Sequence, residues 1–322
     1  MSETKIKISS AFIGRKIQVN SPATIANIVC GFDVIGLALS EPYDTMEVSI
    51  SELPGIRITH TDSFNLPTIP EQNVAGVSLL EMLKEVDCDF GFDIVIHKHI
   101  KPGSGLGSSA ASAAGIVVAV NILIGNPFSD LELVKFAMAG EKLASGVKHA
   151  DNISPCIFGG VTLIRSAFPL DIIPLQFPTM YVTVVHPQIE VKTSDAREIL
   201  RKEVLLKDAI KQWGNIAGLV AGLLNKDYDL ISRSLVDVII EPVRSILIPE
   251  FDKIKNKCLL AGALGGGIAG SGPSIFMLSK EENTALHVAN IIKDIYDQLS
   301  LPYYTYVTTI STRGVNVTYV NF

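Results

Sequence analysis

Short segments in which apolar and polar residues alternate predict strands in the first half of the chain, with glycine and proline between them. The predicted strands cover 16–20, 46–51, 55–60, 92–100 and 159–165. Apolar residues spaced three or four positions apart predict helices among these strands. The predicted helices cover 70–85, 108–124 and 129–145, the last with Ser129 as its N-cap. The helix at 108–124 is apolar or small almost throughout, so we expect it to be buried.

The proline-rich segment 169–178 interrupts this pattern and predicts a domain boundary, with domains at 1–168 and 169–322. Beyond it, runs of helices stand between isolated strands, which indicates an α+β second domain. The strands are expected at 181–186, 274–279 and 303–309, and the helices at 194 to about 235, 250–260 and 281–299. The last strand of the chain is left open as one that returns to the N-terminal domain.

Composition narrows the class of protein. The chain has 322 residues, 48% hydrophobic and 19% charged, which supports a sizeable core and excludes a disordered chain. Lysine and arginine number 27 against 33 acidic residues, a net charge of −6. A protein that tracks nucleic acid would be basic, so we expect no nucleic-acid partner. An anionic ligand would have to be held by local dipoles instead.

The sequence predicts a cytoplasmic protein with no membrane partner. Its longest apolar stretch, 110–124, is interrupted by polar residues and is too short to span a bilayer. The four cysteines are far apart and have neither metal-ligand nor redox spacing, so free thiols are expected. Of these, Cys30 leaves two interpretations open, a thiol near a ligand or a buried packing residue. The sequence does not determine the oligomeric state, and a homodimer remains one possibility.

A glycine-serine loop is the sharpest chemical feature of the chain. It stands between a predicted strand and the small-residue helix, and its residues are Lys101, Pro102, Gly103, Ser104, Gly105, Leu106, Gly107, Ser108, Ser109, Ala110 and Ala111. It lacks the Gly-Lys-Ser/Thr of a Walker loop and the third glycine of a dinucleotide fingerprint. Glycines still let backbone N–H groups approach an anion, and a helix N-terminus adds its dipole. The loop therefore predicts a phosphate site; a tight turn with a serine cap is the alternative.

Glu141 falls on the apolar stripe of its predicted helix, three residues after Met138 and four after Ala137. A carboxylate on a buried face needs a cation or several hydrogen-bond donors. A surface glutamate paired with Lys148 is the alternative.

Four motifs in this order resemble those of the GHMP kinases (the galactokinase, homoserine kinase, mevalonate kinase and phosphomevalonate kinase superfamily). They are the segment 21–33, which ends in Gly31-Phe32-Asp33, the glycine-serine loop, the pair of segments 139–141 and 149–160, and the glycine-rich segment 265–274. The first segment looks like that of the homoserine kinases within this superfamily. Ile25, Lys101 and Ala269 depart from the usual motif residues, but none of them replaces a polar group assigned to chemistry.

The resemblance implies an α+β, two-domain GHMP kinase fold, with an N-terminal α/β nucleotide-binding domain and a C-terminal ferredoxin-like domain. It also implies that the glycine-serine loop and Asn73 bind ATP, and that Ser109 and Glu141 hold magnesium, with Ser108 as the competing serine. Asn73 equally fits a helix N-cap. By the same resemblance Asn27, Asp33, Asn152, Arg197 and Arg244 bind an amino acid substrate, with Asp33 facing its ammonium group and the arginines its carboxylate. Asp151 is left open as a base or an orienting group.

The activity implied by this resemblance is ATP-dependent phosphorylation of L-homoserine to O-phospho-L-homoserine, in threonine biosynthesis. Two alternatives remain at this point: another GHMP small-molecule kinase of the mevalonate type, and a catalytically inactive ligand sensor with the same fold. Ser109 and Glu141 argue against the sensor, and Asp33 favours a substrate with an ammonium group. From local sequence alone, turn capping would explain Asn27, Asp33, Asp151 and Asn152 as well.

Overall fold

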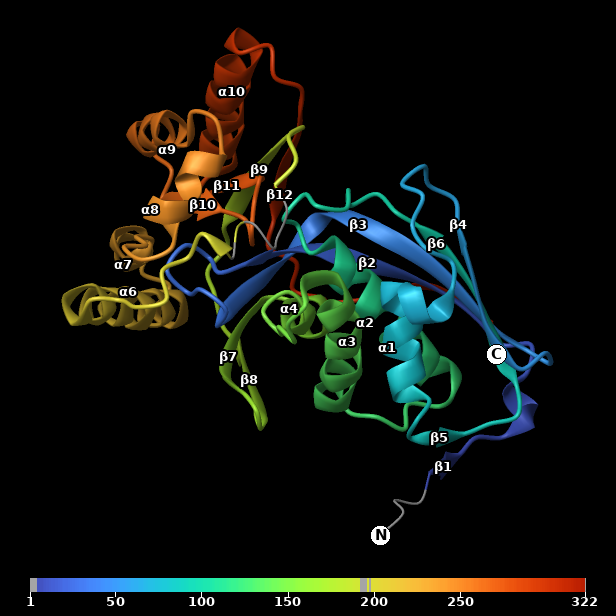
Figure 1. The fold of residues 1–322 in the computed structure, drawn as a ribbon. Coiled ribbons are helices and arrows are strands. Elements are labelled where there is room, and N and C mark those ends of the chain that lie inside the picture. The colour runs from blue at the N-terminus through green and yellow to red at the C-terminus, as the bar shows by residue number, and fades with distance from the viewer. Residues whose placement is uncertain (1–4, 192–195, 197, 322) are drawn as a thin grey trace.

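Two β-sheets organise the chain in a computed structural model that describes residues 5–191, 196 and 198–321 (Figure 1). The first sheet has seven strands in the described residues, in the order β13-β2-β3-β6-β4, with β7 added beside β3 and β8 beside β7. Its strands are β2 (Lys16–Ala26), β3 (Ile35–Ser51), β4 (Gly55–His60), β6 (Gly91–His97), β7 (Val161–Ala167), β8 (Leu170–Leu175) and β13 (Asn316–Asn321). All pairs are antiparallel except β4 with β6.

Helices pack against the first sheet and enclose a core with it (Figure 1). They are α1 (Val74–Met82), α2 (Ser108–Leu123), α3 (Asp130–Ser145) and α4 (Ile153–Phe158). The helix α2 is buried along nearly its whole length, as its small and apolar residues predict. The helix α3 begins with a capping box between Ser129 and Glu132 and ends at Gly146 in the left-handed conformation.

The second sheet is four-stranded and antiparallel, in the order β10-β11-β9-β12. Its strands are β9 (Tyr181–Pro187), β10 (Gly265–Ile268), β11 (Ile275–Ser279) and β12 (Tyr303–Thr309). Its helices are α6 (Leu206–Asn225), α7 (Tyr228–Ser234), α8 (Glu241–Arg244), α9 (Phe251–Leu260) and α10 (Glu282–Gln298). This succession of strands and helices gives the ferredoxin-like arrangement, so the expected C-terminal fold is confirmed.

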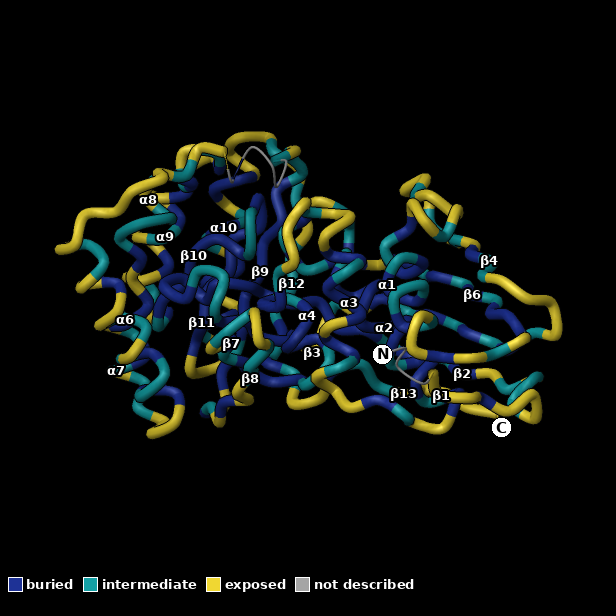
Figure 2. Tube along the Cα trace, turned by 60° about the horizontal axis from the view of Figure 1, so that its bottom comes forward, coloured by how far each residue is buried: buried dark blue, intermediate teal, exposed yellow. Residues whose placement is uncertain are grey.

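Successive side chains along each strand of the second sheet point to opposite faces, and each face packs into a different core. Val185 and Met277 pack with α9 and α10 on one face. Val184 and Phe276 point to the other face, where they join α6, α7 and residues of the first sheet. Residues of both sheets therefore pack in one shared core (Figure 2). This packing holds the two sheets, and the loops between them, in fixed positions relative to each other.

Short elements complete the described fold. They are the parallel pair β1 (Ile6–Lys7) and β5 (Val86–Asp87), and the 3₁₀ turns η1 (Ser10–Phe12), η2 (Pro70–Gln72) and η3 (Ser245–Leu247). None of the helices in the described part of the chain combines the length and apolar character needed to cross a bilayer.

Besides the two-residue strands β1 and β5, three strands were not foreseen from the alternation pattern or lie where a linker was predicted. β8 occupies part of the proline-rich segment 169–178, so the passage from the first sheet to the second falls between Leu175 and Tyr181. β10 is Gly-Gly-Gly-Ile, a sequence with little strand propensity that β11 nevertheless pairs residue by residue. β13 carries the end of the chain back to β2. β8 and β10 pair with the neighbouring strands β7 and β11, whereas β13 pairs with the distant β2, so pairing rather than alternation determines these three strands.

Candidate active site

One pocket of about 390 Å³ lies where the sequence motifs converge. It is lined by residues of the β2–β3 connection, the glycine-serine loop, the end of α3, the start of α4, and the C-terminal half of the chain. From these segments the motif residues that line it are Asn27, Asp33, Asn73, Pro102, Gly103, Ser104, Gly105, Gly107, Ser108, Ser109, Glu141, Asp151, Asn152 and Arg244. Segments more than two hundred residues apart therefore supply one concave site.

The glycine-serine loop is held in a shape that requires glycine. Gly103, Gly105 and Gly107 all have positive φ, between 66 and 82°. At Gly107 a Cβ would lie 2.0 Å from Thr24 Oγ1, so a larger residue would displace the first motif. The loop leads directly into α2, whose first-turn N–H groups and dipole face the pocket. This geometry can hold a phosphate group.

Four members of the predicted loop do not line the pocket. Leu106, Ala110 and Ala111 are buried in the cores, where they anchor the loop and the first turn of α2. Lys101 turns away and donates from Nζ to Gln188 Oε1 at 2.6 Å. Apolar side chains of a phosphate loop thus serve packing, while its glycine backbone and serines face the ligand space.

Ser108 and Ser109, which the sequence could not distinguish, have different hydrogen-bond partners in the structure. Ser108 Oγ donates to the Ile100 carbonyl at 2.8 Å, so its hydroxyl ties α2 to the segment that follows β6. Ser109 Oγ instead donates to Glu141 Oε2 at 2.7 Å, across the pocket from α2 to α3. Glu141 is 9% exposed, and burial raises the pKa of its carboxyl. An ionised carboxylate at this buried position needs a cation or hydrogen-bond donors, of which Ser109 is one.

Asp151 lies in the centre of the acidic part of the site. It is 4% exposed, and burial, followed by the charges of Asp33 and Glu141, raises its pKa to about 7. Its backbone packs against β3, where a Cβ on Gly36 would lie 1.7 Å from the Asp151 carbonyl oxygen. Three carboxyl groups from three segments thus meet in one region, and Asp151 exchanges its proton near neutral pH.

The connection between β2 and β3 is strained at the pocket. Asn27, Ile28 and Val29 have φ values of 76, 38 and 64°, and Asp33 has 60°, all unusual for residues with side chains. Asn27 Nδ2 donates to the Gly270 carbonyl at 2.9 Å, and the Asp33 N–H donates to Asn27 Oδ1 at 3.1 Å. Asn27 thus stabilises a turn, as the turn-capping interpretation of the local sequence predicted. It also links this connection to the C-terminal glycine-rich segment.

Asp33 reaches the pocket beside His149, with 3.7 Å between Asp33 Oδ1 and His149 Nδ1. Asn152 is at the N-cap position of α4, but its side chain makes no capping hydrogen bond to that helix. Instead its Oδ1 accepts a hydrogen bond from Thr24 Oγ1 at 2.7 Å. The amide group of Asn152 therefore faces the pocket, where it can donate to a ligand oxygen.

Arg244 brings a cation to the site from the second half of the chain. Its guanidinium is 4% exposed, donates to the Ala196 carbonyl at 2.9 Å and the Gly270 carbonyl at 3.2 Å, and lies 5.0 Å from the centre of the Phe32 ring. The sequence alternative, a pair with Glu241, is wrong because Glu241 forms its ion pair with Lys255. Arg197, the second predicted arginine, lies outside the described residues.

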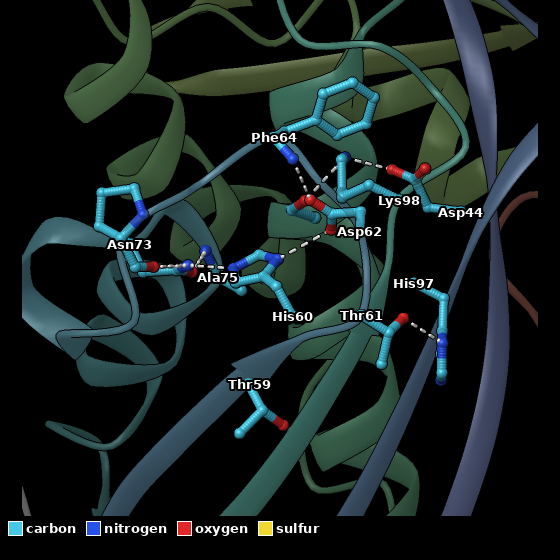
Figure 3. Close-up of polar contacts among 12 residues, drawn as sticks. Asp44, Thr59, His60, Thr61, Asp62, Phe64, Asn73, Ala75, His97 and Lys98 are labelled. Carbon is cyan, nitrogen blue, oxygen red and sulfur yellow. Dashed lines mark hydrogen bonds and ion pairs between the residues drawn. The ribbon is translucent and has the colours of Figure 1, made fainter.

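Asn73 satisfies both of its sequence interpretations. Its Oδ1 accepts from the N–H groups of Ala75 and Gly76, which makes it the N-cap of α1. Its Nδ2 lies 3.1 Å from His60 Nε2, at the wall of the pocket (Figure 3). His60 in turn contacts Asp62 at 3.2 Å. The end of β4 and the start of α1 thus contribute a polar wall to the pocket.

Lys98 is a site residue that the sequence analysis missed. It is 6% exposed, forms an ion pair with Asp44, and donates to the Ser108 carbonyl at 2.7 Å and to Ser112 Oγ at 3.0 Å (Figure 3). Its ammonium group therefore lies under the first turn of α2. The signal was present in the alternation, since Lys98 occupies the same face as the buried residues Ile94 and Ile96.

The sequence analysis also missed Gln212, which holds the strained connection between β2 and β3 in place through hydrogen bonds. Its Nε2 donates to the Cys30 carbonyl at 2.8 Å, and its Oε1 accepts from the Val238 N–H at 3.1 Å. Cys30 itself has no exposed surface, and burial raises its pKa to about 12. Of the two interpretations of Cys30, the buried packing residue is the one that holds.

Comparisons with known proteins agree with this geometry. The family model described as GHMP kinases N terminal domain matches residues 73–160, and that described as GHMP kinases C terminal matches 219–298. A homoserine kinase from Chloroherpeton thalassium is 45% identical over 293 residues, which are 87% of this chain and 92% of that protein. A homoserine kinase from Methanococcus maripaludis is 42% identical over 88% of this chain and 94% of its own length.

Solved structures show the same fold. The crystal structure of a homoserine kinase from Cytophaga hutchinsonii superposes with a TM-score of 0.90 at 46% identity, covering 94% of this chain and 97% of that one. A mevalonate kinase from L. major superposes with a TM-score of 0.68 at 16% identity, a likeness of fold alone.

Proposed function

Because the chain belongs to the GHMP kinase family, with full-length relatives that are homoserine kinases, we propose that it phosphorylates L-homoserine with ATP. The products are O-phospho-L-homoserine and ADP. The observation that carries this proposal is the convergence, in one pocket, of a phosphate-binding loop with an acidic group and an arginine suited to the two charged ends of an amino acid. The first sheet and its helices form the nucleotide domain. The second domain then begins between β8 and β9, a few residues after the predicted boundary at 168/169.

The glycine-serine loop and the N-terminus of α2 are proposed to hold the ATP phosphates, because backbone N–H groups and the helix dipole both favour an anion there. Lys98, which is paired with Asp44, donates to the Ser108 carbonyl and so holds the first turn of α2 in place. Asn73 and His60 line the wall that the nucleotide base would contact.

The donor set of Ser109 and Glu141 fits magnesium. Hard oxygen ligands suit this ion, and the burial of Glu141 gives its carboxylate a reason to bind a cation. When bound, magnesium neutralises charge that develops on the transferring phosphoryl group. We assign this role to Ser109 rather than Ser108, because Ser109 contacts Glu141 whereas the Ser108 hydroxyl contacts the Ile100 carbonyl.

The substrate is proposed to lie between Asp33 and Arg244. Asp33 receives the ammonium group, and Arg244 binds the carboxylate through the planar guanidinium, a geometry that a lysine cannot reproduce. Arg197 stays a proposed second partner of the carboxylate. The buried Arg244 is held by two backbone carbonyls, so its charge is oriented before the substrate arrives.

Asn152 and Asp151 are proposed to act on the substrate hydroxyl. Asn152, fixed by Thr24, orients the hydroxyl toward the phosphate loop. Asp151 accepts the hydroxyl proton, since its pKa of about 7 leaves a substantial ionised fraction at neutral pH. Phosphoryl transfer through a loose transition state depends mainly on positioning and charge neutralisation, which the other residues supply.

An ADP-release assay with L-homoserine, mevalonate, galactose and shikimate tests this function. We expect turnover with homoserine and little with the other three. The homoserine analogue 3-amino-1-propanol, which lacks the carboxylate, should react poorly because Arg244 loses its partner. Preference for mevalonate would refute the proposal in favour of the mevalonate-type alternative, and absence of turnover with all four would favour the inactive sensor.

A matched pair of variants separates the two serines within the same assay. Ser109→Ala should reduce kcat and raise the magnesium concentration needed for half-maximal rate. Ser108→Ala should instead lower thermal stability, because it removes a buried hydrogen bond between α2 and the segment that follows β6. Reversed effects would exchange the roles assigned to these residues.

A further inference from the structure

Arg244 lies on α8, a helix of a single turn that depends on other parts of the chain for its position (Figure 1). The helix covers only Glu241–Arg244, and a turn of this length is not stable through its own hydrogen bonds. Its N-cap residue, Ile240, has an apolar side chain that cannot accept from the first N–H groups. The position of the guanidinium therefore depends on what holds the start of α8.

Asp237 holds the start of α8 from the turn that precedes it. Its Oδ1 accepts hydrogen bonds from the N–H groups of Ile239 at 2.8 Å and Ile240 at 3.0 Å, and its Oδ2 accepts from the Glu241 N–H at 2.8 Å. Asp237 is 7% exposed and has no ion pair within the part of the chain that the structure describes. A buried carboxylate needs donors, so these three bonds stabilise one conformation of the turn and of the helix start.

The same turn is joined to the rest of the site. The Val238 N–H donates to Gln212 Oε1 at 3.1 Å, and Gln212 Nε2 donates to the Cys30 carbonyl at 2.8 Å. The turn that Asp237 organises is thus fixed to α6 and, through Gln212, to the strained connection between β2 and β3.

Asp237 lies behind Arg244 rather than in the main pocket. A second cavity of about 20 Å³ is lined by Asp237, Glu241 and Arg244 among other residues. The lining of the main pocket includes Arg244 but neither of the two carboxylates. Asp237 can therefore affect a ligand in the main pocket through Arg244, and not by touching it.

We propose that Asp237 is a positioning residue that fixes Arg244 for the carboxylate of the substrate, an inference that rests on the proposed homoserine kinase function. A guanidinium binds a carboxylate through two parallel hydrogen bonds, so a small displacement weakens both of them. A misplacement of about 1 Å at a positioned group can cost on the order of 10²-fold in rate. Loss of the Asp237 carboxylate thus weakens recognition of the substrate carboxylate selectively.

Asp237→Asn tests this role, because asparagine keeps the size of the side chain but puts an NH₂ group in place of one accepting oxygen. The experiment measures steady-state kinetics of the full chain with ATP and either L-homoserine or 3-amino-1-propanol, the analogue without a carboxylate. We expect the KM for homoserine to rise about tenfold. The KM for ATP should hardly change, and kcat/KM for 3-amino-1-propanol should equal that of the wild type.

The ratio of kcat/KM for homoserine to that for 3-amino-1-propanol is the decisive quantity. The fraction of folded enzyme cancels in this ratio, so a partly unfolded variant still gives an answer. In an Arg244→Ala background, Asp237→Asn should cause no further loss with homoserine, because the guanidinium that it positions is already gone.

Asp227→Asn is the matched control. Asp227 is the N-cap of α7 and accepts from the Leu230 N–H at 2.9 Å, the same kind of contact in the same half of the chain. No residue of α7 lines the main pocket as the structure describes it. This variant should lower Tm through the loss of a cap but keep the wild-type KM for homoserine.

Three results would overturn the inference: an unchanged homoserine KM in Asp237→Asn, an equal loss with both substrates, or a full additional loss in the Arg244→Ala background. The second would show a general effect on stability or folding, and the third an action that does not pass through Arg244. Failure of the proposed function would look different, since the wild type itself would then not turn over homoserine, and the inference would fall with it.

Discussion

The raised pKa of Asp151 has a measurable effect on stability. Its carboxyl has a pKa of about 7 in the folded protein, against 3.8 as its ordinary value. Between these values the folded state holds a proton that the unfolded state has released. The stability that this proton contributes is therefore complete below pH 3.8 and is lost as the pH rises through 7.

The size of the effect follows from the two pKa values. One pKa unit corresponds to about 1.4 kcal/mol, so protonation of Asp151 stabilises the ligand-free wild type by roughly 2 to 3 kcal/mol more at pH 5 than at pH 8. Asp151→Asn cannot titrate and lacks this gain. Relative to the wild type, the variant should thus be most stable at pH 8, where the wild type buries a charge next to Asp33 and Glu141.

Thermal unfolding by circular dichroism at pH 5, 6, 7 and 8, without nucleotide, magnesium or homoserine, measures this difference. Contributions from other titrating groups are common to both proteins and cancel when the Tm of the wild type is subtracted. We expect the difference in Tm to change by roughly 3 to 4 °C between pH 8 and pH 5, in the direction given above. Asp294→Asn, at an exposed position on α10, is the control and should follow the wild type.

A difference in Tm between Asp151→Asn and the wild type that does not vary with pH would refute the reasoning. It would mean that the carboxyl is already ionised in the folded protein at pH 5. The same pH trend in Asp294→Asn would assign the effect to global charge instead of burial.

Three further predictions concern catalysis, substrate binding and the strained connection. Glu141→Gln should lower kcat on the order of 10²-fold while leaving far-ultraviolet circular dichroism unchanged, and unaltered turnover at saturating magnesium would remove Glu141 from the site. Arg244→Lys should raise the KM for homoserine and hardly change that for ATP, because the planar fork is lost; a wild-type homoserine KM would show that the carboxylate lies elsewhere. In the native protein iodoacetamide should label the partly exposed Cys88 well before the buried Cys30, as peptide mapping can show, and equal rates would contradict the burial of Cys30.

Much of the site could be predicted from local sequence because its parts are continuous segments. The glycines and serines at 103–109 directly precede a helix, so a phosphate cradle follows from backbone chemistry alone. Helical spacing placed Glu141 on a buried face, where the structure finds it. Strand alternation likewise placed Lys98 on a buried face, although its role was not recognised.

Choices between neighbouring or chemically equivalent groups needed the tertiary structure. Ser108 and Ser109 are adjacent and alike in sequence, and only the position of Ile100 decides which hydroxyl is free to face Glu141. The proton affinity of Asp151 depends on burial and on two carboxyl groups from other segments, so no local pattern contains it.

The sequence by itself determined the order of most helices and strands, the phosphate loop and the apolar face of each helix, because these depend on residues a few positions apart. It did not determine β10 or β13, whose strand conformation comes from pairing with β11 and β2. In α6 the sequence supplies two apolar stripes, and only the packed fold decides that Leu219 and Leu223 are covered while Trp213 stays exposed. Burial is a property of what lies opposite a side chain, and in this protein that partner comes from distant parts of the chain.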